Sequence, residues 1–132
     1  MIFFETSFIV GFYVSKTANH ELAKEIAKKY KDTPKAISEM TIYETMTVLR
    51  KLNQDDNKLK EVYDYLINSK DITVFEDVIY YEKALKETFI NSVGFFDNLS
   101  HVVMLNNGIE KIASFDFDFD LFKDIERIGQ NP

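Results

Sequence analysis

Ile2-Phe3-Phe4-Glu5-Thr6-Ser7-Phe8-Ile9 opens the chain with an apolar triplet, an acid and a second apolar run that continues to Val14. A short apolar run bounded by a polar residue predicts a buried strand over residues 2–4, and the longer run predicts a helix over 6–14. Glu5 then stands where the strand ends and the helix begins. The stretch therefore predicts a strand-to-helix unit with a carboxylate at its junction.

The rest of the chain repeats this alternation of short strands and longer helices. Strands alternating with helices favour an α/β fold with a parallel sheet. No repeat, low-complexity tract or linker interrupts the pattern, so we expect one domain over residues 1–132. We expect further strands over 35–38, 72–75, 111–115 and 124–128, and helices over 19–30, 38–52, 59–67, 78–90 and 95–106.

The composition excludes some chemistries. The chain has no cysteine, so disulfides and thiolate metal sites are ruled out. Its 22 acidic and 16 basic residues give a net charge of −6, which counts against a simple electrostatic nucleic-acid binder. We find no basic leader and no apolar run of about 20 residues, so we expect no membrane association and a cytoplasmic location.

Four acids stand at positions that such a sheet could bring together. Glu5 and Asp116 directly follow predicted strands, and the carboxyl ends of parallel strands form the ligand-binding edge of open α/β sheets. Glu44 lies inside the 38–52 helix and Asp97 begins the 95–106 helix. Each acid also has an ordinary alternative: Asp97 as a helix cap, Glu44 as a half-exposed side chain, and the other two as loop acids.

Taken together, the four carboxylates predict a site for a hard cation. Mg²⁺ and Mn²⁺ prefer oxygen ligands and bind through a few carboxylates, water and phosphate. Such ions promote phosphodiester cleavage without a nucleophilic side chain, and the chain has no convincing Ser-His-Asp set. A phospho-receiver domain is disfavoured, because the first strand ends in one acid rather than an acidic pair.

Four stretches of this sequence resemble the PIN-domain family, and the VapC-like toxins in particular. The likeness covers nearly the whole chain and depends on the order, spacing and context of the acids rather than on one short motif. It is carried by the opening segment 2–9, by Ile37-Ser38-Glu39-Met40-Thr41-Ile42-Tyr43-Glu44 and the helix that continues to Lys51, by Phe95-Phe96-Asp97-Asn98-Leu99, and by the segment from Gly108 through Ser114-Phe115-Asp116-Phe117-Asp118-Phe119-Asp120.

The resemblance implies a three-layer α/β/α fold with a short central parallel sheet. It further implies a Mg²⁺- or Mn²⁺-dependent endoribonuclease, the toxin of a toxin–antitoxin pair, with RNA as substrate, an antitoxin as partner and a homodimer as its assembly. By resemblance, the metal ligands would be Glu5, Glu44, Asp97 and Asp116, with Ser7 supporting the site through its hydroxyl and Asp118 as a reserve ligand.

One position departs from the family pattern, which has Asp where this chain has Glu5. The extra methylene moves the carboxylate by about 1.5 Å, and a shift of about 1 Å can cost on the order of 100-fold in rate. Three interpretations of Glu5 follow. It is a natural variant in a reshaped site, a substitution made to reduce the toxicity of the protein during expression, or a sign that the domain has weakened activity and mainly binds a partner. The weakened module would hold an antitoxin peptide, whose Arg a carboxylate site would attract.

Other residues have weaker assignments. Arg50 and Lys51 are candidates to contact the RNA backbone, although solvated helix charges are the more usual explanation of such residues. His101 follows Asp97 by one helical turn and would touch substrate or act structurally. The apolar side chains of the first helix are expected in the core rather than at a partner surface.

Overall fold

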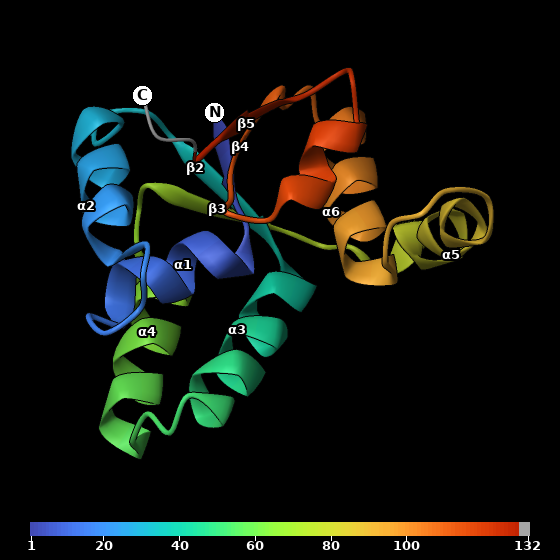
Figure 1. The fold of residues 1–132 in the computed structure, drawn as a ribbon. Helices are drawn as coiled ribbons and strands as arrows, with labels where there is room; N and C mark the ends of the chain where they lie inside the picture. Colours follow the sequence, from blue (N-terminus) through green and yellow to red (C-terminus); the bar gives the residue numbers. More distant parts are fainter. Residues whose placement is uncertain (130–132) are drawn as a thin grey trace.

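Five short parallel strands form the centre of the molecule, in the order β3-β2-β1-β4-β5 (Figure 1). The computed structural model describes residues 1–129. Every neighbouring pair of strands is parallel, so all carboxyl ends lie at one edge. The strands are β1 (Ile2–Phe4), β2 (Lys35–Ser38), β3 (Ile72–Phe75), β4 (Lys111–Ala113) and β5 (Glu126–Ile128).

Helices cover both faces of this sheet (Figure 1). Phe4 packs in a core with α1 to α4, whereas its neighbour Phe3 packs on the opposite face with α5 and α6. Successive strand side chains alternate between faces, so β1 feeds both cores. The helices are α1 (Thr6–Tyr13), α2 (His20–Lys29), α3 (Glu39–Lys51), α4 (Asp56–Asn68), α5 (Tyr81–Ile90) and α6 (Phe95–Asn106), with short 3₁₀ helices η1 (Val78–Tyr80) and η2 (Phe117–Leu121).

This arrangement confirms the predicted α/β fold with a short parallel sheet between helical layers. Phe8 and Ile9 of α1 are buried in the core, as expected, while Phe12 and Tyr13 pack partly buried at its margin. Within residues 1–129, no helix is both long and apolar enough to pass through a lipid bilayer.

Several predicted boundaries were wrong, among them the start of the last strand, which is Glu126 rather than 124. β4 ends at Ala113 rather than Phe115, because the amides of Phe115 and Asp116 donate to the hydroxyls of Ser7 and Ser114 instead of to a neighbouring strand. α4 begins at Asp56 rather than 59, because Asp55 caps it by accepting from the Lys58 amide. The predicted helix over 78–90 begins as the separate 3₁₀ helix η1.

The strand order positions a crevice at one point of the edge. β1 is flanked by β2 on one side and β4 on the other, so the chain changes direction across the sheet between β1 and β4. Ligands in open α/β sheets bind beyond the carboxyl ends of the strands at such a switch. Glu5 follows β1 and Ser114 follows β4, so both lie at this point.

Candidate metal centre

Glu5 occupies the junction of β1 and α1 as a buried carboxylate. It is 7% exposed, and its Oε1 accepts hydrogen bonds from Ser7 Oγ at 2.5 Å and from Ser114 Oγ at 2.6 Å. Burial raises the pKa of Glu5 above its usual range, while these hydroxyls oppose the shift. The strand-end position predicted for Glu5 is therefore an enclosed polar pocket rather than a loop surface.

Glu44 reaches the same edge from α3. Its Oε1 accepts a hydrogen bond of 2.5 Å from Thr6 Oγ1, which joins the first turn of α1 to the second turn of α3. The start of α3 is fixed by a capping box between Ser38 and Thr41 and by Asp77, whose carboxylate accepts from the Met40 amide at 2.8 Å. Burial, and to a lesser extent the charge of Asp116, raises the pKa of Glu44.

Asp97 lies in the first turn of α6 but does not cap it, because Gly94 occupies the cap position. Burial raises the pKa of Asp97 to about 8, with further contributions from Asp116, Glu5 and Glu44. These contributions require all four carboxyl groups to lie within electrostatic reach of one another. Glu44 and Asp97, 53 positions apart in the sequence, are therefore on the same side of the molecule.

The loop after β4 supplies two more carboxylates. Asp116 caps η2 and its carboxylate accepts a hydrogen bond of 2.9 Å from the Asp118 amide. One carboxylate oxygen from each of Asp97, Asp116 and Asp118 lies within 4.8 Å of the other two. Asp120 has a different role, since both of its oxygens accept from the guanidinium of Arg127.

This spacing fits a small divalent cation. Oxygen ligands bind Mg²⁺ at about 2.1 Å, so two ligands on opposite sides of the ion are separated by about 4.2 Å. The three aspartates are therefore spaced to share one ion after small adjustments. The raised pKa of Asp97 also fits, because carboxylates crowded without a counter-charge favour a bound proton that a cation would replace.

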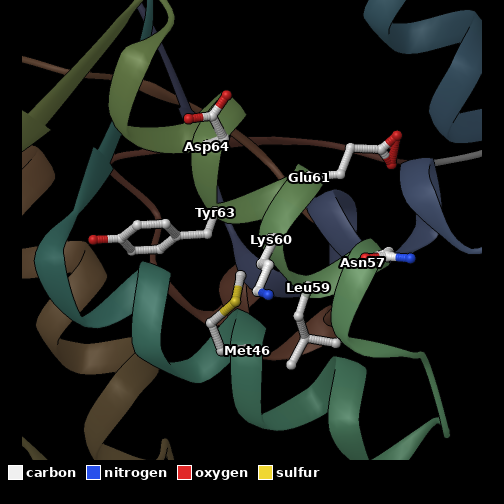
Figure 2. A pocket seen from close by; sticks show the side chains of 7 residues that line it. All are labelled: Met46, Asn57, Leu59, Lys60, Glu61, Tyr63 and Asp64. Atoms are coloured by element: carbon white, nitrogen blue, oxygen red, sulfur yellow. The ribbon is translucent and has the colours of Figure 1, made fainter.

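Glu5 and Glu44 border a hollow beside these aspartates. It has a volume of about 330 Å³, and Ser7, Asn19 and Phe115 also line it. A larger hollow, of about 630 Å³, lies between α3 and α4 and is lined by none of these five acids. Figure 2 shows the side chains of Met46, Lys60 and Leu59 grouped between the two helices, with Tyr63 and Glu61 directed away to opposite sides. The remaining lining residues of this hollow are Asn57 and Asp64.

Two residues of the site escaped the sequence analysis, namely Thr6 and Ser114. Thr6 orients Glu44, and Ser114 is fully buried against Glu5. Ser114 directly follows β4 in the structure, but the predicted strand continued to Phe115 and so placed Ser114 inside the strand rather than at its end. Thr6 carried no signal in the sequence, because its partner is 38 positions away.

The weaker candidates lie outside the acidic cluster. Arg50 forms an exposed ion pair of 2.6 Å with Asp56 at the corner between α3 and α4, and Lys51 is exposed beside it. His101 stacks on Phe122 with ring centroids 3.8 Å apart, and its Nε2 lies 2.8 Å from Asp124 Oδ1. These contacts favour the structural alternative for both Arg50 and His101.

We compared this chain with known proteins and solved structures. No curated protein matches the sequence. Among solved structures, the VapC20 toxin of Mycobacterium tuberculosis, described as cleaving the sarcin–ricin loop, is similar with a TM-score of 0.84 and 24% identity over 96% of this chain and 98% of that chain. A toxin–antitoxin complex from Klebsiella pneumoniae is similar with a TM-score of 0.68 and 14% identity, covering 96% of each chain.

A third solved structure is VapBC2 from Rickettsia felis, bound to a DNA fragment from its promoter. It has a TM-score of 0.66 and 15% identity, and the match covers 97% of this chain and 98% of that chain. At such identities these three likenesses establish a shared fold. The family model of the PIN domain matches residues 2–125, nearly the whole sequence. The chain therefore belongs to the PIN domain family.

Proposed function

We propose that this protein is a metal-dependent endoribonuclease and the toxin of a toxin–antitoxin pair. The observation that carries the proposal is the meeting of carboxylates from four separate segments at the switch between β1 and β4. Membership of the PIN domain family and the described activity of VapC20 on the sarcin–ricin loop support RNA as the substrate. The antitoxin partner is supported by the toxin–antitoxin complexes of similar fold.

We assign the cation to a site held by Asp97 and Asp116, with Glu5 and Glu44 completing the set and Asp118 in reserve. When bound, Mg²⁺ or Mn²⁺ would neutralise charge that builds on the phosphate and lower the pKa of a water molecule near it. Thr6 and Ser7 orient two of the carboxylates through their hydroxyls. A fixed carboxylate array spares the reorganisation that flexible side chains would need.

Asp97 has a specific part in this assignment. With a pKa of about 8, it carries a proton at neutral pH in the metal-free protein. Ligation requires the carboxylate form, so cation binding releases that proton. The affinity for the cation therefore rises with pH up to about 8, and RNA cleavage follows it.

The test is cleavage of an RNA that contains a sarcin–ricin loop. We expect cleavage by the wild-type protein with Mn²⁺, loss of cleavage with EDTA, and a loss of at least 100-fold in Asp97→Asn. Asp32→Asn is the matched control, because Asp32 is an exposed acid between α2 and β2. Equal cleavage in EDTA, or by Asp97→Asn, would contradict the proposal.

The remaining assignments follow from the same resemblance. We expect the protein to form a homodimer and to act in the cytoplasm. Size-exclusion chromatography with light scattering at micromolar concentration tests the assembly, and a mass of one chain would contradict it.

A further inference from the structure

We infer that this metal centre is built for a glutamate at position 5, and that Ser114 is the positioning residue that makes the longer side chain necessary. The inference rests on the proposed function, because it concerns how the same site holds its cation. It opposes the interpretation of Glu5 as the mark of a weakened site. Under that interpretation, Glu5→Asp strengthens cation binding; under ours, it weakens cation binding.

The hydrogen-bond directions around Glu5 carry the argument. Ser114 Oγ accepts from the Asp116 amide at 3.0 Å, and Ser7 Oγ accepts from the Phe115 amide at 2.9 Å. Each hydroxyl has one hydrogen to donate, and each donates it to Glu5 Oε1. The backbone after β4 therefore sets the direction of both hydroxyls, and the two hydroxyls set the position of the Glu5 carboxylate.

The backbone of Glu5 cannot move to rescue a shorter side chain. Its amide donates to the carbonyl of Ala113 at 3.1 Å, and its carbonyl accepts from the amides of Phe8 and Ile9 at 3.0 and 3.2 Å. Aspartate is shorter by one bond of about 1.5 Å. Starting from 2.5 and 2.6 Å, that retreat carries its carboxylate out of hydrogen-bond range of the two hydroxyls.

Glutamate also leaves an oxygen for a cation. Both hydroxyl bonds end on Oε1, so neither occupies Oε2. Ser114 is 0% exposed, so the Glu5 carboxylate and not bulk water accepts from its hydroxyl. Loss of a residue that orients a metal ligand typically lowers the metal affinity by about 10- to 100-fold.

The first experiment measures Mn²⁺ affinity by isothermal titration calorimetry. We expect Glu5→Asp and Ser114→Ala each to bind Mn²⁺ about 10- to 100-fold more weakly than wild type. Ser100→Ala is the matched control, since Ser100 is a buried serine of α6 whose hydroxyl makes no hydrogen bond to the acids among residues 1–129, and its affinity should equal that of wild type. Equal or tighter binding by Glu5→Asp would overturn the inference.

The second experiment needs no metal. Thermal unfolding in EDTA is measured for wild type, Glu5→Asp, Ser114→Ala and the double variant. Ser114→Ala removes the acceptor of the Asp116 amide in both backgrounds, but it removes a hydrogen bond to the Glu5 carboxylate only when Glu is at position 5. We therefore expect the Tm to fall by about 5 °C more in the wild-type background than with Asp at position 5. Equal losses in both backgrounds would show that Ser114 does not act on Glu5.

The two experiments separate the inference from the proposed function. A wild-type protein that binds no Mn²⁺ but gives unequal losses contradicts the nuclease proposal while the Glu5–Ser114 pairing stands. Tight Mn²⁺ binding with equal losses contradicts the pairing alone.

Discussion

The carboxyl group of Asp97, in the first turn of α6, lies beside that of Asp116, which follows β4, and one oxygen of each is within 4.8 Å of the other. Two carboxylates this close repel each other, which favours a proton on one of them. Burial first, and this neighbour second, raise the pKa of Asp97 to about 8. The acidic edge of the metal-free protein therefore retains a proton that the unfolded chain would lose.

This retained proton makes metal-free stability depend on pH. Asp97 titrates near 3.8 when unfolded and near 8 when folded, so the folded state binds more protons between these values. The free energy of unfolding in EDTA should therefore fall as pH rises from about 4 to about 8. Because the side chain is partly exposed, we expect a loss of about 1–3 kcal/mol. Urea unfolding at pH 5 to 9 measures it.

Asp97→Asn has no carboxyl group to titrate and should lose most of this slope. Glu5 and Glu44 also have raised pKa values, so a smaller slope of the same sign should remain. Asp32→Asn should keep the wild-type slope. A slope in Asp97→Asn equal to that of wild type would refute the assigned titration.

Thr6→Val tests the link between α1 and α3. The substitution removes the donor to Glu44 Oε1 while keeping a branched side chain at a buried position. We expect a loss of about 1.5–3 kcal/mol in the free energy of unfolding and weaker Mn²⁺ binding. Thr6→Ser keeps the hydroxyl and should stay close to wild type in both measurements. Identical affinities for Val and wild type would mean that Thr6 does not orient Glu44.

Asn98 holds the loop from which Asp97 enters the site. It is 0% exposed, and its amide contacts Thr88, Asn91 and the carbonyls of Val93 and Gly94. Asn98→Ala should cost about 2–4 kcal/mol, because several buried polar groups lose their partner. It should also lower kcat, since Asp97 is its chain neighbour.

A second asparagine of α6 provides the control for Asn98. Among residues 1–129, the side chain of Asn106 bonds only the Val102 carbonyl of its own helix, and Asn106→Ala should cost under about 1 kcal/mol. Chemical denaturation measures both. Equal losses for the two variants would show that the loop before α6 does not depend on Asn98.

His101 should contribute to stability and not to cleavage. Its side chain is 14% exposed, stacks on Phe122 and bonds Asp124. His101→Ala should lower the free energy of unfolding by about 1–2 kcal/mol, with kcat and Mn²⁺ affinity unchanged. A fall in kcat of tenfold or more, with the protein fully folded, would show that His101 contacts the substrate.

The acidic edge could be predicted from the sequence because the order and direction of the strands determine where these acids lie. Parallel strands end at one edge, so acids that follow β1 and β4 must be neighbours whatever the details of packing. Asp118 was harder to assign, because its proximity to Asp97 depends on the turn of η2, and a strand would have carried the alternating acids differently. The end of β4 at Ala113, set by two serine hydroxyls, decides this register.

Side-chain hydroxyls could not be assigned from the sequence for a related reason. Ser114 and Glu5 are 109 positions apart, and their bond exists only once β1 and β4 pair. The early start of α4, in contrast, had a local signal, since Asp55 is a favoured cap directly before the helix. Local chemistry predicts helix ends, while the environment of a buried carboxylate depends on contacts across the whole sheet.

The central claim is that carboxylates from distant segments hold one divalent cation, and a crystal soaked in Mn²⁺ tests it most directly. Diffraction data at a wavelength where manganese scatters anomalously should give a peak within about 2.5 Å of oxygens from both Asp97 and Asp116. The same soak of Asp97→Asn should lose most of that peak. A wild-type crystal at saturating Mn²⁺ with no anomalous density at these aspartates would contradict the account.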